Sequence, residues 1–182
     1  MKRVFIALNP PNEVKGNLNL IQNSWRSSSG KLVKWVNPVN LHLTFHFLGE
    51  ISDDLVKKVG KLLVTIAPKT NHIYLTLGGL GAFPSPGRAS VAYIEVFERD
   101  GAALSRLHED ISIQLKIIGL NTGERPLAPH VTLGRLRRPA SITTNWYKAK
   151  TIPWTVNSIE LMESKLRPTG PEYSCLISAK LG

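Results

Sequence analysis

Two short segments of this chain share a histidine, a threonine two positions later and an apolar residue after the threonine. They are His42-Leu43-Thr44-Phe45 and His130-Val131-Thr132-Leu133. Each lies in a run typical of a β-strand, in which residues i and i+2 project from the same face. Histidine titrates near neutral pH, so it serves as a general acid or base, and a threonine hydroxyl donates hydrogen bonds to anionic oxygens. Two such strands side by side would gather two imidazoles and two hydroxyls around one small volume.

Chance explains one copy of this motif more easily than two. The chain has 5 His and 11 Thr among 182 residues, and random placement then predicts about 0.3 His-x-Thr matches. One copy is typical of a half-buried strand with polar residues on its solvent-exposed face. Two copies with the same apolar fourth residue favour one shared site.

A metal centre is the main competing interpretation of the histidines. His42 and His46 are four residues apart on a strand, roughly 13 Å, which is too far for both to bind one ion. The sequence has no His-Glu-x-x-His motif, and its single cysteine, Cys175, excludes a zinc site built from cysteines. We therefore expect no metal and no cofactor.

The elements around the motifs predict an α+β fold. Helices are expected near residues 11–25, 52–68 and 101–118, and a Gly/Pro-rich loop over 78–87. Strands are expected over residues 4–8, 32–36, 41–48, 73–77, 91–96, 127–133, 159–166 and 173–177. Helices alternate with hairpin-like strand pairs, which favours antiparallel sheets. Because one motif strand falls in each half, we expect one domain over 1–182, made of two pseudo-symmetric lobes with the site in a groove between them.

Composition places this chain among ordinary soluble globular proteins. It is 42% hydrophobic and 20% charged, and its formal net charge is +10. The excess of Lys and Arg predicts a polyanionic partner, and the absence of a long basic run assigns the charge to a folded surface. No apolar stretch approaches the length of a membrane span, and the N-terminal one is too short for a signal peptide. We expect a cytoplasmic monomer without a membrane partner.

Eight segments of the sequence together resemble a known family. They are residues 3–8, 33–36, 40–45, 47–50, 79–84, 129–135, 161–166 and 170–173. Through them the chain resembles the two-histidine (2H) phosphoesterases, and most nearly the bacterial and archaeal RNA 2′,3′-cyclic phosphodiesterases, first described as 2′-5′ RNA ligases. The resemblance spans nearly the whole chain. It implies a bilobal fold, a central groove that holds both motifs, and RNA with 2′,3′-cyclic phosphate ends as the partner.

The resemblance also implies a reaction and roles for the motif residues. Opening a cyclic phosphate ester with water needs a base for the water, an acid for the departing oxygen and donors for the phosphoryl oxygens. By resemblance, His42 is the proton donor to the 3′ oxygen and His130 is the proton acceptor, so the product is a 2′-phosphomonoester. Thr44 and Thr132 would bind phosphoryl oxygens. The sequence alone does not distinguish the acid from the base.

Two further residues are substrate-binding candidates by resemblance. Arg135 would bind phosphate, although strict alternation points it away from Thr132 unless Gly134 permits a bulge. His46 stands where relatives often carry Lys. By alternation it shares the face of His42, so any contribution to phosphate binding would depend on pH.

Other interpretations remain open from the sequence. Within the family, the alternatives are reversible 2′-5′ RNA ligation and hydrolysis of a small cyclic nucleotide. Outside it, the alternative is an RNA-binding module without turnover, which the intact His and Thr of both motifs disfavour. Arg137 and Arg138, just beyond the second motif, are expected to form a basic patch that touches the RNA backbone.

Overall fold

A computed structural model describes residues 1–99, 101–122, 126–144, 152–168 and 170–182. Its α-helices are α1 (Asn12–Ser29), α2 (Asp53–Ile66) and α3 (Ala103–Ile117). Its strands are β1 (Lys2–Leu8), β2 (Val33–Trp35), β3 (Leu43–Ile51), β4 (Ile73–Phe83), β5 (Ala89–Glu98), β6 (His130–Ala140), β7 (Ile152–Val156), β8 (Ser158–Arg167) and β9 (Gly170–Lys180). Short 3-10 turns η1 (Gly30–Leu32), η2 (Pro38–Asn40), η3 (Ala67–Lys69) and η4 (Pro86–Arg88) link them.

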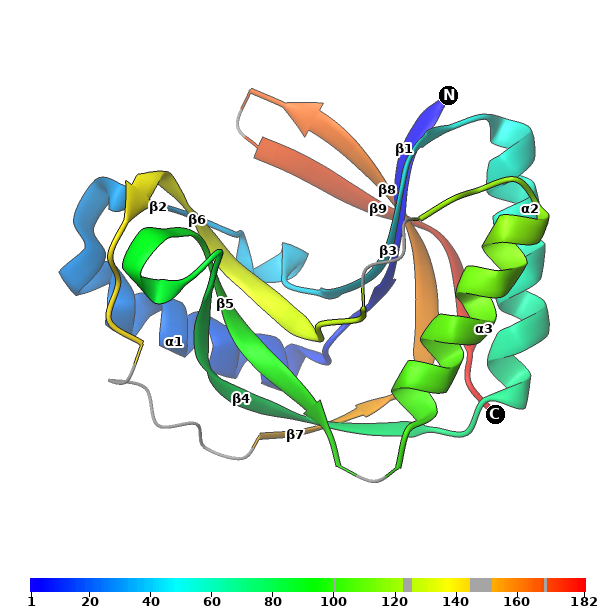
Figure 1. The fold of residues 1–182 in the computed structure, drawn as a ribbon, viewed down its shortest axis with the longest axis horizontal. Coiled ribbons are helices and arrows are strands. Elements are labelled where there is room, and N and C mark those ends of the chain that lie inside the picture. The colour runs from blue at the N-terminus through cyan, green and yellow to red at the C-terminus, as the bar shows by residue number, and fades with distance from the viewer. Residues whose placement is uncertain (100, 123–125, 145–151, 169) are drawn as a thin grey trace.

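The strands form a curled antiparallel sheet with the order β7-β4-β5-β6-β3-β1-β8-β9, and β2 pairs with β6 (Figure 1). Four strands of this path belong to each half of the molecule. The halves meet at the β3–β6 junction, where a single residue pair is in register. The predicted α+β class with antiparallel strands and two halves is confirmed, and the two halves share one continuous sheet.

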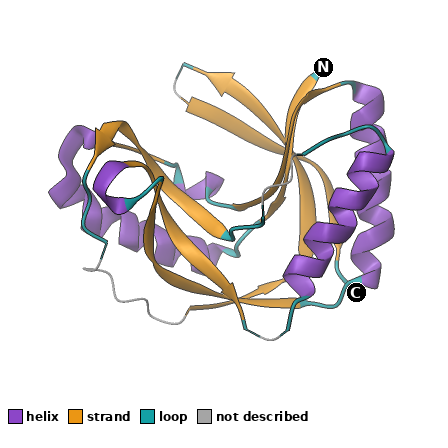
Figure 2. Cartoon of the chain, viewed as in Figure 1, coloured by secondary structure: helices purple, strands orange, loops and turns teal. Residues whose placement is uncertain are grey.

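Each helix has an apolar stripe that packs against the sheet. In α2 the buried apolar side chains are Val56, Val59 and Leu63, spaced three and four residues apart as one helical face requires, and Gly60 is buried beside them. The Ser52 side chain caps this helix by accepting a hydrogen bond from the backbone N–H of Leu55 at 3.3 Å. Helices α2 and α3 lie side by side against the half that contains β8 and β9, whereas α1 lies against the other half (Figure 2).

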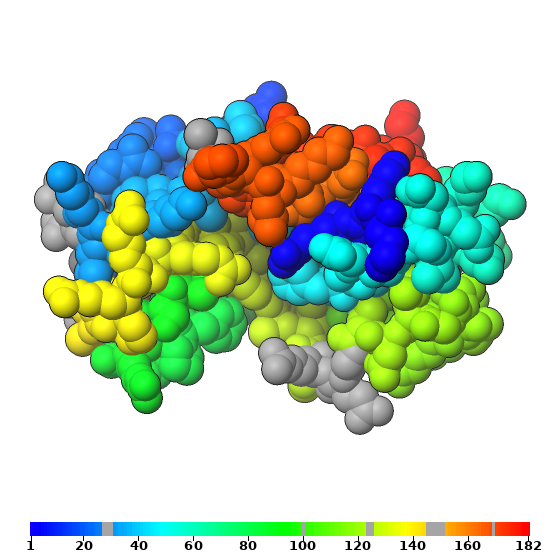
Figure 3. Space-filling model, turned by 90° about the horizontal axis from the view of Figure 1, so that it is seen from above, coloured from blue at the N-terminus to red at the C-terminus, as the bar shows by residue number. Residues whose placement is uncertain are grey.

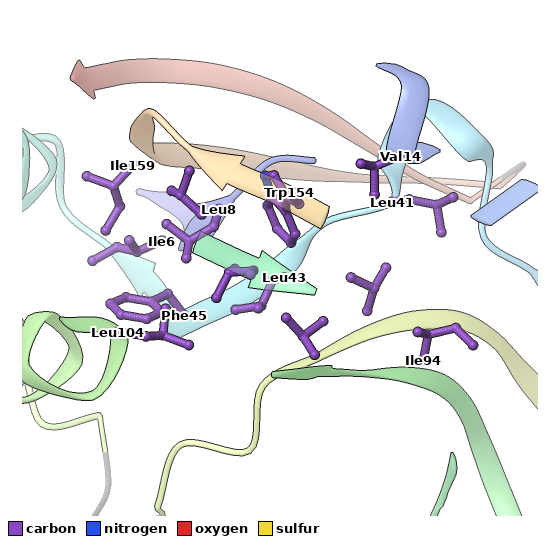
Figure 4. Close-up of a cluster of buried hydrophobic side chains, with 14 of the residues drawn as sticks. Ile6, Leu8, Val14, Leu41, Leu43, Phe45, Ile94, Leu104, Trp154 and Ile159 are labelled. Carbon is purple, nitrogen blue, oxygen red and sulfur yellow. The ribbon is translucent and has the colours of Figure 1, made fainter. Parts of the chain in front are cut away.

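The hydrophobic core lies on the face of the sheet that carries Leu43 (Figure 4). Ile6, Leu8 and Leu43 have no exposed surface, and Trp154 of β7 is 2% exposed. Burial of a large apolar side chain contributes about 1.5–3 kcal/mol to stability. The junction of the two halves is therefore anchored by the core beneath it.

The opposite face is hollowed. In the space-filling view a recess lies between the β8–β9 hairpin, in orange, and the strands β5 and β6, in green and yellow (Figure 3). The hairpin tip projects beyond the sheet on one side of this recess (Figure 1). No helix in the described part of the chain has the length and apolar character to cross a membrane.

Each expected helix and strand is present, but several bounds differ: β6 covers His130–Ala140 and not 127–133, and β9 covers Gly170–Lys180 and not 173–177. Two regions differ further. The loop expected over 78–87 is wrong in its first half, because β4 continues to Phe83 and only then turns. The sequence assigned no element to residues 139–153. There β6 ends at Ala140 and β7 begins at Ile152, and residues 145–151 lie outside the described part of the chain.

Candidate active site

The two motifs are neighbours across the β3–β6 junction. The pair that joins the strands in register is Leu43 with Val131, the second residue of each motif. In an antiparallel ladder this places His42 beside Thr132, and Thr44 beside His130. Leu43 and Val131 have no exposed surface, so both histidines and both threonines project from the other face, into the recess. The structure therefore brings together the four residues that the sequence predicted to share a site.

Each motif histidine is held by a backbone carbonyl two residues earlier. His42 Nδ1 lies 2.7 Å from the oxygen of Asn40, and His130 Nδ1 lies 2.7 Å from the oxygen of Ala128. A carbonyl oxygen only accepts hydrogen bonds, so Nδ1 must donate in both cases. The proton at Nδ1 is thereby fixed, and Nε2 is the atom that exchanges a proton with a substrate.

His42 also contacts the threonine of its own motif. Its Nε2 lies 2.9 Å from Thr44 Oγ1. Burial lowers the pKa of His42, and the positive charge of Lys15 and a charged His130 act in the same direction, whereas the hydrogen bond to Asn40 opposes them. In the free protein His42 is therefore held toward its neutral form, whose Nε2 accepts a hydrogen bond from the Thr44 hydroxyl.

A phenylalanine and a tyrosine flank each histidine. The ring of His42 lies 4.8 Å from Phe5 and 5.3 Å from Tyr173. The ring of His130 lies 5.1 Å from Phe83 and 5.1 Å from Tyr93. These aromatic residues were not predicted from the sequence as part of the site. They restrict the orientation of both imidazoles and exclude water from one side of each ring.

A glycine in β4 makes room for one of these tyrosines. Gly81 pairs with Tyr93, and a Cβ at Gly81 would lie 2.4 Å from Cε2 of the Tyr93 ring. The ring therefore lies across the backbone of β4, in the space that a side chain would fill. The run Gly78-Gly79-Leu80-Gly81 was the sequence signal that could have indicated this close contact.

Arg135 lies on the site face because β6 is irregular. In the pairing of β5 with β6, Tyr93 is opposite Thr132, Ala92 is opposite Gly134 and Val91 is opposite Arg135, so Leu133 has no opposing residue. The extra residue is a bulge that restores Arg135 to the face of Thr132. Burial raises the pKa of the nearby Tyr173, and the charges of Arg135 and Arg3 oppose this effect. Arg135 is thus near enough to the recess to act electrostatically on its wall.

His46 does not lie on the site face, so the expectation that it faces the same way as His42 is wrong. Ile6 pairs with His46 while Ala7 pairs with Thr44, which leaves Phe45 as an extra residue in β3. This bulge turns His46 into the core face, where it is 4% exposed. Its ring stacks on that of His108 in α3, with centroids 4.2 Å apart and an angle of 11° between the planes. It therefore cannot bind substrate in the recess.

The described residues contain no group of three or more His, Cys, Asp or Glu side chains placed to hold a metal ion. The acidic residue on the site face of β8, Glu160, is occupied by neighbours. It accepts hydrogen bonds from Ser158 at 2.6 Å and from Asn9 at 3.3 Å. Among the described residues, β3 and β6 bring two imidazoles, two hydroxyls and the Arg135 guanidinium to this face, and Glu95 of β5 pairs in register with His130.

Comparison with known proteins gives consistent results. Residues 8–93 match the family model described as LigT like phosphoesterase. An RNA 2′,3′-cyclic phosphodiesterase of Archaeoglobus fulgidus is 31% identical over 180 residues, covering 96% of this chain and 97% of the relative. One of Methanocaldococcus jannaschii is 27% identical, covering 96% and 98%.

Solved structures share the fold. The crystal structure of TT0787 of Thermus thermophilus superposes with a TM-score of 0.86 at 28% identity, covering 98% of this chain and 97% of the other. The apo form of Escherichia coli LigT superposes with a TM-score of 0.74 at 26% identity, covering 99% and 97%. The similarity therefore extends over both halves and the recess between them.

Proposed function

Because the chain belongs to the LigT-like 2H phosphoesterases, we propose that it hydrolyses RNA 2′,3′-cyclic phosphodiester ends to 2′-phosphomonoesters, by two-histidine acid–base catalysis without a metal ion. The observation that carries this proposal is the pairing of Leu43 with Val131, which sets two His-Thr pairs on one face of the sheet. Relatives that cover nearly the whole chain are named for this activity.

The reaction follows from the chemistry of these groups. His130 Nε2 accepts a proton from a water molecule, whose oxygen attacks phosphorus. The bond from phosphorus to the 3′ oxygen breaks, and His42 Nε2 gives its proton to that oxygen. The phosphate remains on the 2′ oxygen. One proton is taken up and one is released, so the imidazoles exchange protonation states and are reset by proton exchange with solvent.

The remaining polar groups of the recess would stabilise the phosphoryl oxygens. Thr44 and Thr132 have hydroxyls that donate hydrogen bonds to them, and the Arg135 guanidinium adds a charge-assisted pair. Hydrogen bonds to a charged group are worth about 1.5–3 kcal/mol each. These interactions strengthen as negative charge develops, which is what accelerates a reaction rather than only binding its substrate.

The role of His42 as the acid requires its protonated form, whereas burial in the free protein lowers its pKa. A bound phosphate supplies a negative charge beside the imidazole, which favours the protonated form. Once Nε2 carries a proton, it no longer accepts a hydrogen bond from the Thr44 hydroxyl. That hydroxyl is then released to donate to a phosphoryl oxygen.

The test is incubation of the protein with an oligoribonucleotide that ends in a 2′,3′-cyclic phosphate, with and without excess EDTA. The expected product is the 2′-phosphate, identified by its resistance to 3′-specific phosphatases and by ³¹P NMR, at equal rates in both arms. A 3′-phosphate product would mean that the 2′ oxygen leaves phosphorus, and not the 3′ oxygen as proposed. Activity lost on chelation and restored by Zn²⁺ or Mn²⁺ would contradict the metal-free mechanism, and RNA binding without turnover would identify a binding module.

A further inference from the structure

Two positive side chains face each other across strands β2 and β6. Lys34 pairs in register with Arg135, so their side chains leave the same face of the sheet, with Cβ atoms about 5 Å apart. Both residues are exposed. Like charges directly opposite each other destabilise a sheet. An anion between them would remove this repulsion.

Nothing in the surrounding sequence neutralises this pair. The sequence has no Asp or Glu between Glu13 and Glu50, or between Glu124 and Glu160, and these intervals contain both strands. Elsewhere in the described part of the chain, the cations with carboxylate partners are Lys2, Lys58, Lys165 and Arg167. Among the residues that the structure describes, neither Lys34 nor Arg135 has one. The positive charge of this surface is thus left available to a ligand.

Lys34 and Arg135 lie beside the proposed catalytic residues, at the start of a cationic surface that extends along β6 away from them. Arg135 follows Thr132 on the site face of β6, and Lys34 lies beside it on β2, about 4.8 Å away in the hydrogen-bonding direction, along the edge of β6 that also pairs with β3. The cationic surface continues to Arg137, whose Nε donates to the oxygen of Lys31 at 3.0 Å. An extended RNA strand that leaves the recess along this edge of β6 would pass Lys34.

We propose that Lys34 binds the internucleotide phosphate next to the terminal nucleotide when a 2′,3′-cyclic end occupies the site. This inference rests on the proposed function. The cyclic phosphate is at the 3′ end of the RNA, so every other phosphate lies on its 5′ side, and the first of them is the one that Lys34 reaches. Arg135 then holds the reacting phosphate, Lys34 holds the next, and each cation faces one anion. The site distinguishes an RNA end from a free cyclic nucleotide.

The experiment compares a nucleoside 2′,3′-cyclic phosphate with a dinucleotide that ends in the same nucleotide. The two substrates differ by one phosphate, so in the unmodified protein the dinucleotide should have a log–log salt slope of kcat/KM steeper by about 0.7. Lys34→Gln should remove this difference and lower kcat/KM for the dinucleotide about three- to tenfold. It should leave the mononucleotide reaction unchanged. Lys57→Gln is the matched control, because Lys57 is an exposed lysine of α2 and its loss changes the net charge equally.

Two outcomes would overturn the inference: equal salt slopes for both substrates in the unmodified protein, or equal behaviour of Lys34→Gln and Lys57→Gln. Failure of the proposed function is a separate result, since neither substrate would then be hydrolysed. In that case the salt slopes of the Kd for a dinucleotide and a mononucleotide 2′-phosphate decide the matter. A slope difference that depends on Lys34 supports the site, and equal slopes overturn it.

Discussion

The two motif histidines are held in the same way by different parts of the chain. Each donates its Nδ1 proton to a backbone carbonyl two residues earlier, and each is flanked by a phenylalanine and a tyrosine. Their surroundings differ, because His42 contacts the Thr44 hydroxyl and is half-buried within reach of the Lys15 charge. A shared geometry with unequal electrostatics is what acid–base catalysis by a pair of identical side chains requires.

The first prediction at this scale concerns both histidines. His42→Ala and His130→Ala should each reduce turnover of a 2′,3′-cyclic phosphate about 10²–10⁴-fold, because each removes one proton-transfer partner from the transition state. Steady-state kinetics measures the effect. His72→Ala is the control, since His72 is exposed and lies far from the recess, at the backbone oxygen of Gly182. Full activity in either motif variant would contradict the assignment.

The second prediction concerns pH. Burial and the Lys15 charge lower the pKa of His42, so its protonated form is lost as pH rises through a value below the ordinary 6.5. We expect a bell-shaped profile of kcat/KM with one limb below pH 6.5. Lys15→Gln removes the repelling charge and should move that limb to higher pH, whereas Lys57→Gln should leave it in place. If Lys15→Gln leaves the pH of this limb unchanged, the limb does not report the titration of His42.

The third prediction concerns the guanidinium. Arg135→Ala should lower kcat/KM about 10–100-fold even for a nucleoside 2′,3′-cyclic phosphate, because it loses a charge-assisted contact worth about 1.5–3 kcal/mol with the reacting phosphate. Arg137→Ala, two residues farther along β6, should leave the mononucleotide reaction intact and weaken only longer RNA. An unchanged mononucleotide reaction in Arg135→Ala would make Arg135 an ordinary surface charge.

At the scale of elements, the site depends on where strands depart from regular alternation. The sequence predicted the four motif residues because Leu43 and Val131 lie in regular segments. The predicted face of His46 was wrong because no residue type near Phe45 indicates the bulge there. For Arg135, the glycine at 134 allowed a bulge to be considered, but the offset itself depends on pairing with β5. Pairing between distant strands decides such positions, and local sequence carries little information about it.

The helices were easier to predict than the aromatic residues of the site. The apolar spacing of α2 and the Ser52 cap are local signals, and the expected bounds of 52–68 lie close to Asp53–Ile66. Phe83 reaches His130 only because β4 continues through a glycine run that is also typical of a loop. Turn composition and strand composition conflict there. The packing of Tyr93 over Gly81 resolves the conflict in favour of a strand.

The element-scale prediction tests the contact between β2 and β6. A Cβ at Gly134 would lie 2.5 Å from Val33 Cγ1 and 3.2 Å from the backbone oxygen of Lys34. Gly134→Ala should therefore destabilise the protein by about 1–3 kcal/mol, measured by urea unfolding, and lower activity through Arg135. Gly16→Ala in α1 is the control. No atom lies within 4 Å of its added Cβ, and the change should stabilise the helix by about 0.5–1 kcal/mol.

At the scale of the molecule, the proposed active site lies where its two halves are joined. Each half contributes one histidine and one threonine, and the junction is a single pair in register above a shared core. Neither half contains all four motif residues, so the proposed catalysis requires both halves in place. The ion pairs are also unevenly distributed: in the described part of the chain, Lys34 of β2 and Arg135 of β6 have no ion-pair partner, whereas Lys165 and Arg167 of the β8–β9 hairpin form ion pairs with Glu163 and Glu172. Under the proposed function, this asymmetry gives the groove one side that suits RNA.

The last prediction concerns stability in acid, through a contact between the sheet and α3. His46 is buried against His108, and burial, aided by the charge of His108, lowers the pKa of His46 to about 4. The unfolded chain binds a proton near pH 6.5, so the unfolded state holds more protons than the folded state between about pH 6.5 and 4. The contribution of His46 to the free energy of unfolding is therefore present above pH 6.5 and is lost progressively as the pH falls toward 4, by up to about 3 kcal/mol.

A leucine at this position would not titrate. The difference in unfolding free energy between His46→Leu and the unmodified protein should accordingly move in favour of the variant as the pH is lowered from about 7.5 to about 5, as measured by urea unfolding followed by circular dichroism. His72→Leu is the control at an exposed histidine, and its difference should stay nearly constant. Parallel loss of stability in His46→Leu and the unmodified protein would mean that other groups govern unfolding in acid. Because His46 faces the core and not the recess, the variant should retain its activity at neutral pH.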